Sequence, residues 1–421
     1  MIATGYRYLK KFGLKRSLAA LLLYGSRRLT PEINVREVDQ LIARPHLSID
    51  RRLEWYDFTA RDIERNREVV DAWTRTKRRP VSTANWLVPD FRDVYAGVRN
   101  IFRLVNFLAQ KKVENRIVIF GDNPETDGLI RGELSRAFPD LKGIKVLRNP
   151  NVDSIPYADI SVATYWATAY PLLKFNNTKG KYYFIQDDES MFYEAGVWQA
   201  LVELTYTFGF VGITTAPPLK EMYIRNFRTE AESFNPCVDR SIFYPQRKSP
   251  RDRLQRIFFY ARPAMPRNGF ELGVLALEKL KRQHPDVEIV TWGSDLDEWN
   301  IPGDIKNLGY LSLEETADLY RSCDAGLYLM FTPHPGVIPF ELMACGCLVV
   351  SNDHSAHRKA LRNGYNCILT EPTVSRMVEA FEMLSANAKL RTELFRNGLS
   401  TVDQNDWNSE LEKVYRFVLG K

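Results

Sequence analysis

The stretch RIVIFG, residues 116–121, contains the β-branched run Ile117-Val118-Ile119 and ends in a glycine. Continuous apolar runs of this kind are typical of strands buried on both faces of a parallel sheet. The preceding residues 95–112 carry apolar side chains at helical spacing, and ANWLVP at 84–89 is a second short apolar run. Strand, helix and strand in this order predict a parallel α/β arrangement.

The alternation continues toward the C-terminus in residues 144–148, 158–170, 181–189 and 200–216. It predicts a doubly wound α/β domain, in which ligands bind beyond the carboxyl ends of the strands. The loops at 90–97 and 186–189 follow predicted strands. We therefore expect both loops to face a ligand.

A second α/β series begins after an irregular stretch at 232–255 that is rich in proline and charge. This series opens with RIFFYAR at 256–262 and continues with FELGVLALEKLKRQ at 270–283. We expect a domain boundary in the irregular stretch, because few contacts cross such linkers. We expect an N-terminal extension at 1–80 and a first Rossmann-like domain at 81–243. A second Rossmann-like domain is expected at 244–401, followed by a C-terminal helix at about 402–421 that completes the first domain.

The net charge of +6 is concentrated at the N-terminus, because residues 1–30 hold seven basic residues and no acidic one. The nearly neutral remainder argues against a broad nucleic-acid-binding face. Residues 1–30 have three interpretations: an interfacial helix on anionic lipid, a surface helix packed on the body of the protein, or a targeting peptide. The third is disfavoured, because the apolar stretch 18–24 is short and no Ala-x-Ala-like cleavage site follows it.

No apolar run approaches the ~20 residues that span a bilayer. The five cysteines are odd in number and have no zinc-binding spacing. We expect them to be reduced core residues. The expected location is the cytoplasm, at the inner face of the membrane if residues 1–30 bind lipid.

Two arginines follow the first strand of the second series. Arg262 ends RIFFYAR, and Arg267 lies in PAMPRNG before the next helix. Guanidinium groups match phosphate oxygens in geometry and charge, so this pair is suited to holding a diphosphate. The alternative is a pair of solvated surface arginines.

The segment PHPGVIPFELMACG, residues 333–346, places a stiff loop before a short helix. Gly336 would let the backbone approach a ligand, and free amides at a helix start attract phosphate. Glu341, in the first turn, can accept hydrogen bonds from pentose hydroxyls. Its alternative role is to complement the helix dipole. His334 is expected either to contact the ligand or to pack the loop.

The turn Gln186-Asp187-Asp188-Glu189 ends a predicted strand with three acids. Its carboxylates could bind acceptor hydroxyls, and metal binding is a weaker interpretation. A solvated turn with a helix N-cap is the structural alternative. Tyr165 and Trp166 could stack on a sugar, although aromatic residues at such positions are more often in the core.

In their order, these motifs resemble the nucleotide-binding half of retaining family 4 glycosyltransferases of the GT-B fold. The segments that carry the resemblance are 234–245, 259–272, 305–330 and FELMACGCLVV at 340–350. YFIQDDESMFYEAG at 183–196 and TPHPGVIPFELMA at 332–344 are similar to rhamnosyltransferases of the S-layer glycan type, which use dTDP-L-rhamnose. This likeness extends into the first domain from about residue 94.

The resemblance implies two Rossmann-like domains that face each other across a cleft. It implies that Arg262 and Arg267 stabilise the leaving diphosphate, with Asp187 and Asp188 beside the acceptor. It further implies a set of donor contacts: Gly97, Arg262, Arg267, Gly293, Tyr310, His334, Pro335, Gly336 and Glu341. The donor is a nucleotide diphosphate sugar, the acceptor is a glycan or lipid-linked glycan, and no metal or cofactor is expected.

Two positions depart from the family pattern. Pro333 stands where the family has a glutamate that contacts the donor sugar, and Asn268 stands where it often has a lysine. The first departure is compatible with a deoxysugar donor. It is also compatible with a catalytically degenerate protein that binds nucleotide sugar or glycan without turnover. An epimerase would need an acid–base pair such as Asp187 and Asp188, and a phosphorylase would need a lysine for pyridoxal phosphate, for which there is no strong candidate.

Overall fold

The computed structural model describes residues 50–76, 80–302 and 304–421. The chain divides into two compact units, Met1–Asp57 and Phe58–Lys421. The described end of the first unit is a short 3-10 helix, η1 (Arg51–Tyr56), whose start is capped by the Asp50 side chain. The basic segment 1–30 and its three interpretations lie outside the described residues.

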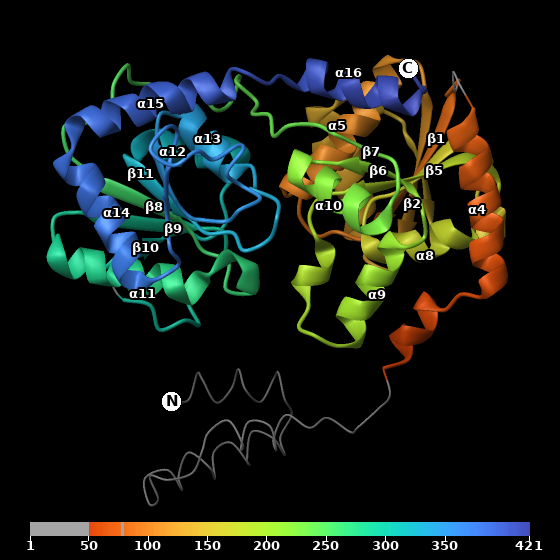
Figure 1. Cartoon of the computed structure of the whole chain (residues 1–421), viewed down its shortest axis with the longest axis horizontal. Coiled ribbons are helices and arrows are strands. Elements are labelled where there is room, and N and C mark those ends of the chain that lie inside the picture. The colour runs from red at the N-terminus through yellow and green to blue at the C-terminus, as the bar shows by residue number, and fades with distance from the viewer. Residues whose placement is uncertain (1–49, 77–79, 303) are drawn as a thin grey trace, which may run out of the picture. The chain divides into compact units, whose positions relative to one another are not determined.

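The second unit contains two parallel sheets, and we call the parts of the chain built on them the first and the second lobe. The sheet of the first lobe has seven strands in the order β3-β2-β1-β4-β5-β6-β7 (Figure 1). These strands are β1 (Thr83–Pro89), β2 (Glu114–Phe120), β3 (Lys145–Arg148), β4 (Ala158–Ala163), β5 (Thr178–Ile185), β6 (Val211–Thr214) and β7 (Ala231–Ser233). The β-branched run Ile117-Val118-Ile119 lies in β2, and its three residues are completely buried. The continuous apolar character of β2 thus reflects a strand covered on both faces.

Helices connect these strands: α4 (Ala60–Arg75), α5 (Ala96–Gln110), α6 (Glu125–Leu129), α7 (Ser135–Ala137), α8 (Trp166–Lys174), α9 (Val197–Tyr206) and α10 (Pro217–Phe227). A π-helical turn, Ile130–Leu134, joins α6 to α7, and short 3-10 turns are η3 (Pro139–Leu141), η4 (Val152–Ser154) and η5 (Glu189–Phe192). The apolar residues expected on one face of α5 are indeed buried.

Helix α4 lies within the range assigned to a separate extension, but it packs against β5 and α8 of the first sheet. Its buried Trp73 donates a hydrogen bond from Nε1 to the hydroxyl of Tyr182, at 2.8 Å. Gly180 provides the space for this indole, because a Cβ atom there would lie 2.5 Å from the Trp73 ring. Residues 60–75 are therefore part of the first lobe's structure.

The second sheet has six strands in the order β10-β9-β8-β11-β12-β13. They are β8 (Arg256–Tyr260), β9 (Glu288–Trp292), β10 (Ile305–Asn307), β11 (Ala325–Tyr328), β12 (Leu348–Asn352) and β13 (Ile368–Thr370). The connections are η6 (Pro266–Asn268), α11 (Phe270–Gln283), α12 (Leu313–Ser322) and α13 (Ile338–Ala344), and the chain ends in α14 (Val374–Ala386), α15 (Ala388–Val402) and α16 (Trp407–Val418). The capping box expected from Ser312 and Glu315 starts α12.

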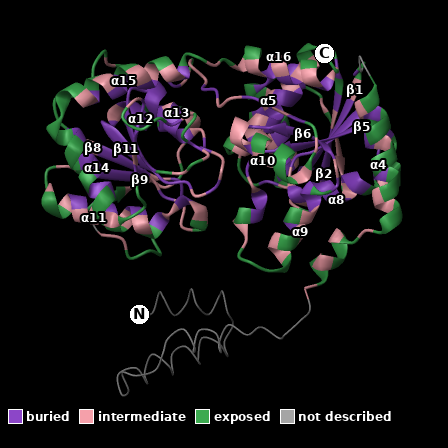
Figure 2. Ribbon diagram, viewed as in Figure 1, coloured by how far each residue is buried: buried purple, intermediate pink, exposed green. Residues whose placement is uncertain are grey.

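The predicted doubly wound α/β architecture is confirmed in both sheets. Strand order reverses between β1 and β4 in the first sheet and between β8 and β11 in the second, and loops after such strands hold ligands in this class of fold. Figure 2 shows the strands of both sheets buried and the outer faces of the helices exposed. The last helix, α16, packs against α5 and β7, which are elements of the first sheet.

The five cysteines are buried and unpaired, as expected. Among the described residues, no helix is both long enough and apolar enough to cross a membrane.

Candidate functional site

Arg262 and Arg267 both lie in the loop that follows β8. Arg262 Nη1 donates a hydrogen bond to the hydroxyl of Tyr260 at 2.9 Å. Arg267 belongs to η6, and its guanidinium carbon lies 3.9 Å from the ring centroid of Phe192. Both arginines are therefore held by aromatic side chains and are only half-buried.

Three loops of the second lobe converge on a pair of tyrosines. The rings of Tyr260 and Tyr328 are stacked with centroids 6.4 Å apart. A Cβ atom at Gly336 would lie 1.9 Å from the Tyr328 hydroxyl, and one at Gly293 would lie 2.9 Å from the Tyr260 ring. The loops that carry Arg262, Gly293 and Gly336 therefore meet at this tyrosine pair.

Glu341 lies within electrostatic reach of Tyr328, one member of this pair. Burial raises its pKa to about 8, and the charge of Arg99, from α5 of the first lobe, opposes this rise. The pKa of Tyr328 is raised chiefly by burial, with further increases from Tyr260, Asp187 and Glu341 and an opposing effect of Arg267. The carboxyl groups and the guanidinium group are thus within electrostatic reach of one hydroxyl.

His334 packs the loop before α13. Its Nδ1 accepts a hydrogen bond from the Gly336 amide at 3.0 Å. Burial lowers the pKa of His334 to about 4, so the ring is neutral near pH 7. The Gly336 amide, expected to face a ligand, is consequently already paired. Pro335 between them is buried, and Pro339 occupies the second position of α13 because the helix starts at Ile338.

The acids of the 186–189 turn have partners within the protein. Asp187 accepts a hydrogen bond from the Thr332 hydroxyl at 2.9 Å, and Asp188 caps η5 by accepting from the Ser190 amide and hydroxyl. Glu189 accepts from the Trp166 amide at 2.7 Å and from the Tyr183 hydroxyl at 3.2 Å. The N-cap alternative is therefore the arrangement found for Asp188.

Burial dominates the electrostatics of this turn. It raises the pKa of Asp187 to about 7, and the hydrogen bond from Thr332 and the charge of Arg267 oppose the rise. It also raises the pKa of Glu189 to about 8. Both carboxyls are buried, and the predicted role of Asp187 toward an acceptor stays a prediction.

The two loops expected at the edge of the first sheet do meet. A Cβ atom at Gly97 would lie 3.5 Å from the side-chain amide of Gln186, whose Oε1 accepts from Asn100 at 3.4 Å. Gly97 thus lies where the 90–97 loop enters α5, next to the acidic turn.

Three other residues differ in their exposure. Tyr310 is 73% exposed, and its contact with the donor stays a prediction. Asn268, the substitute for the family lysine, is buried and donates to the Leu329 carbonyl at 3.4 Å. Trp166 is buried among Tyr165, Tyr170 and other aromatic rings, which is the core alternative for this residue.

The sequence did not point to Phe192, Thr332 or Tyr260. Phe192 and Thr332 each form a contact between the two lobes, with Arg267 and Asp187 respectively. The available signal was the position of Thr332 and Tyr260 at strand ends, which identifies a loop but not a contact partner. Throughout the described ranges, no three His, Cys, Asp or Glu side chains group in a way that could hold a metal ion.

Solved structures share this architecture. TarM of S. aureus aligns with a TM-score of 0.66 at 10% identity, covering 82% of this chain and 100% of that one. HepE of Anabaena, crystallised with UDP and glucose, aligns with a TM-score of 0.63 at 14% identity, covering 80% of this chain and 99% of that one. The fold is GT-B. Both GT-B lobes are represented, since these alignments span most of residues 58–421.

Sequence relatives match either most of this chain or a part of it. A family model described as WsaF, C-terminal domain, matches residues 255–382. The O-antigen biosynthesis protein RfbC of Myxococcus xanthus is 39% identical over 386 residues, which are 90% of this chain and 30% of that protein. A phosphatidyl-myo-inositol mannosyltransferase of Mycolicibacterium smegmatis is 28% identical over 179 residues, or 39% of this chain and 45% of that protein. The chain thus spans less than a third of RfbC and less than half of the mannosyltransferase.

Proposed function

We propose that this chain is a retaining glycosyltransferase that transfers L-rhamnose from dTDP-L-rhamnose to a glycan acceptor. The observation that carries the proposal is the convergence of Arg262, Gly336 and Glu341 on the Tyr260–Tyr328 pair, at the strand ends where GT-B folds bind ligands. The similarity to an O-antigen biosynthesis protein and to a mannosyltransferase supports sugar transfer into a glycan.

In this proposal the arginines supply the main catalytic effect. During transfer, the bond between the sugar C1 and the diphosphate oxygen breaks, and a bond from C1 to an acceptor hydroxyl oxygen forms on the same face. The acceptor proton passes to the departing phosphate, so no side-chain base is required. Arg262 and Arg267 stabilise the negative charge that develops on the diphosphate. Positioning of the two substrates supplies the rest.

Glu341 is assigned to the pentose of the donor. With a pKa of about 8, its carboxyl is largely protonated at pH 7. It can therefore both donate and accept a hydrogen bond, which suits the single 3′-hydroxyl of a deoxyribose. Arg99 lies within electrostatic reach of this carboxyl.

The preference for a deoxysugar rests on Pro333. The family 4 glycosyltransferases that the chain resembles carry a glutamate at this position, and that glutamate contacts the donor sugar. Proline has no side-chain hydrogen-bond acceptor. A sugar with fewer hydroxyl groups loses fewer hydrogen bonds through this change than a fully hydroxylated hexose does. We therefore place L-rhamnose ahead of glucose or mannose, and we propose transfer without a metal or cofactor.

The test is turnover by the full chain with dTDP-L-rhamnose and a rhamnose-ended acceptor, with UDP-glucose and GDP-mannose as competing donors and EDTA present. We expect product from dTDP-L-rhamnose only. Arg262→Ala should lower kcat/KM by roughly 10²–10³-fold, equivalent to about 2.7–4 kcal/mol. Arg396→Ala, an exposed arginine on α15, is the matched control and should be unchanged.

Binding without turnover would instead identify the degenerate alternative. Thermal shifts with dTDP, UDP and GDP give that readout, because a ligand stabilises the folded state that binds it. A shift with dTDP but no product with any donor would refute the enzymatic proposal. A shift with UDP or GDP alone would refute the choice of nucleotide.

A further inference from the structure

A cavity of about 670 Å³ opens at the carboxyl ends of β1 and β2. Its lining includes Asp90, Arg92 and Tyr95 from the loop after β1, and Asp122 and Asn123 from the loop after β2. The volume lies within the range of pockets for small ligands. None of these residues has a role in the donor site described above.

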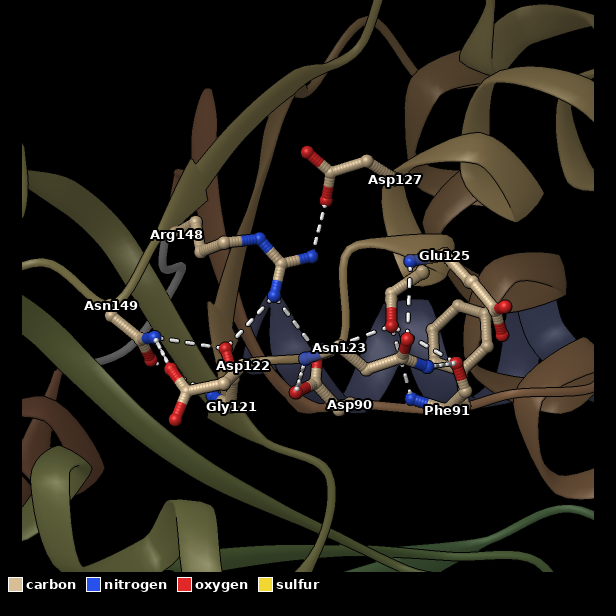
Figure 3. Close-up of polar contacts among 10 residues, drawn as sticks. Asp90, Phe91, Gly121, Asp122, Asn123, Glu125, Asp127, Arg148 and Asn149 are labelled. Atoms are coloured by element: carbon tan, nitrogen blue, oxygen red, sulfur yellow. Dashed lines mark hydrogen bonds and ion pairs between the residues drawn. The ribbon is translucent and has the colours of Figure 1, made fainter.

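Asp90 joins the two loops that form the cavity (Figure 3). Its Oδ1 accepts hydrogen bonds from Arg148 Nη1 at 3.0 Å and from the Thr126 hydroxyl at 3.1 Å. Its Oδ2 accepts one from the backbone amide of Asn123 at 2.6 Å. Gly121 permits this approach, because a Cβ atom there would lie 2.0 Å from Asp90 Oδ2. The carboxylate is thus fully engaged in fixing the floor of the cavity.

Residues at the end of β3 complete the frame. Arg148 also donates to Asp127 Oδ1 at 2.6 Å and to the Gly121 carbonyl at 2.8 Å. Asn149 donates from Nδ2 to Asp122 Oδ1 at 2.9 Å, as Figure 3 shows. The loops are therefore positioned by internal hydrogen bonds before any ligand is present, which reduces the cost of ordering them on binding.

Three groups in the lining remain available. Within the described residues, Arg92 has no hydrogen bond or ion pair, and Asp122 uses only Oδ1. Tyr95 is 55% exposed. The charge of Asp90 is balanced by Arg148, so the available charges are one guanidinium and one carboxylate. This balance favours a neutral ligand that carries both donors and acceptors.

Tyr95 connects the cavity with the donor arginines. Although the residue as a whole is exposed, its pKa is raised first by desolvation of the hydroxyl and then by the charge of Glu189, and it is lowered by Arg262 and Arg267. The Tyr95 hydroxyl is therefore within electrostatic reach of both arginines, although its residue also lines the cavity. A Cβ atom at Gly97, which is expected to contact the donor, would lie 3.0 Å from the Tyr95 ring, so a ligand packed on Tyr95 would lie next to an expected donor contact.

We propose that this cavity is the acceptor site and that it binds the terminal sugar of a neutral glycan. The apolar face of the sugar packs on the Tyr95 ring, and vicinal hydroxyls donate to Asp122 and accept from Arg92. Aromatic rings combined with carboxylate and guanidinium groups provide both contacts that a sugar ring requires. The assignment rests on the proposed glycosyltransferase function.

The test measures binding of a fluorescently tagged L-rhamnose disaccharide to the full chain, in the presence of dTDP. We expect Arg92→Ala and Asp122→Asn each to weaken disaccharide binding at least five-fold. Both variants should keep the wild-type melting temperature and the wild-type affinity for dTDP. Arg67→Ala and Asp71→Asn, exposed residues on α4, are the matched controls and should bind like the wild type.

Unchanged disaccharide binding in both cavity variants would overturn the acceptor site while leaving the donor function intact. Absence of disaccharide binding by the wild-type chain at millimolar probe would overturn it as well. Failure of the proposed function has a different signature, namely no dTDP binding and no turnover. In that case, disaccharide binding that depends on Arg92 and Asp122 would still establish a sugar site.

Discussion

Gly336 shows how one residue connects the sequence with the site. Its φ of +72° lies in the left-handed region, and its missing side chain leaves room for the Tyr328 hydroxyl. A glycine after His334-Pro335 was expected to let the backbone approach a ligand. In the structure it lets the backbone approach Tyr328, and its amide is paired with His334. The left-handed backbone and the approach of Tyr328 explain the glycine, and a contact of this loop with a ligand stays a prediction.

Gly336→Ala should destabilise the chain by about 2–5 kcal/mol, combining left-handed strain of about 1–2 kcal/mol with overpacking of about 1–3 kcal/mol. Urea unfolding measures this difference. Gly364→Ala is the control, because Gly364 has a similar φ of +70° but open space around its Cβ position. It should lose only the strain contribution. Equal losses in both variants would contradict the close contact with Tyr328.

At the scale of elements, two short 3-10 turns bring the lobes together. η5 carries Phe192 and η6 carries Arg267, and their contact places a guanidinium group over an aromatic face. Neither turn has the length or periodicity that a sequence pattern requires. If Arg267 binds the donor diphosphate, Phe192 acts as a positioning residue from the opposite lobe.

Phe192→Leu should raise the Kd for dTDP by about two- to five-fold, because a cation–π contact contributes about 0.5–1 kcal/mol. Isothermal titration calorimetry measures the affinity. Phe417→Leu, a half-buried phenylalanine on α16, should leave it unchanged. Wild-type affinity in Phe192→Leu would show that the ring does not position Arg267 for the nucleotide.

At the scale of the whole molecule, buried carboxyls make stability depend on pH. Burial raises the pKa of Asp187 to about 7, and those of Glu189 and Glu341 to about 8. In the unfolded chain these groups lose their protons near pH 4. As pH rises from about 4 to 8, the unfolded state therefore releases protons before the folded state, and stability falls.

Glu189→Gln should reduce the loss of stability between pH 5 and pH 9 by up to about 4 kcal/mol, since about three units separate pH 5 from the folded-state pKa of about 8 and each unit corresponds to about 1.4 kcal/mol. The amide oxygen of glutamine can still accept from the Trp166 amide and the Tyr183 hydroxyl. Urea unfolding at the two pH values gives the comparison, with the exposed Glu64→Gln as control. Parallel pH profiles for Glu189→Gln and wild type would show that Glu189 does not titrate between the two states in this range.

The sequence by itself determined the α/β architecture of this protein. Apolar periodicity is a local property, so the strand at 116–120 and the helix at 96–110 could be recognised without knowledge of their neighbours. Short edge strands such as β7, β10 and β13 lack enough residues to show a period, and they emerged only from pairing. Arg262 and Arg267 could be predicted as candidate site residues because they lie in the loop after a recognisable strand.

Only the tertiary structure decided which side chains meet. Thr332 reaches Asp187 across 145 positions of the chain, and Asp90, Asp122 and Arg148 gather from the ends of three strands. Parallel strands require long crossovers, so loops at one edge of a sheet are always distant in sequence. The pairing of the acidic turn and the frame of the cavity at the ends of β1 and β2 therefore follow from the folded topology and not from any local pattern.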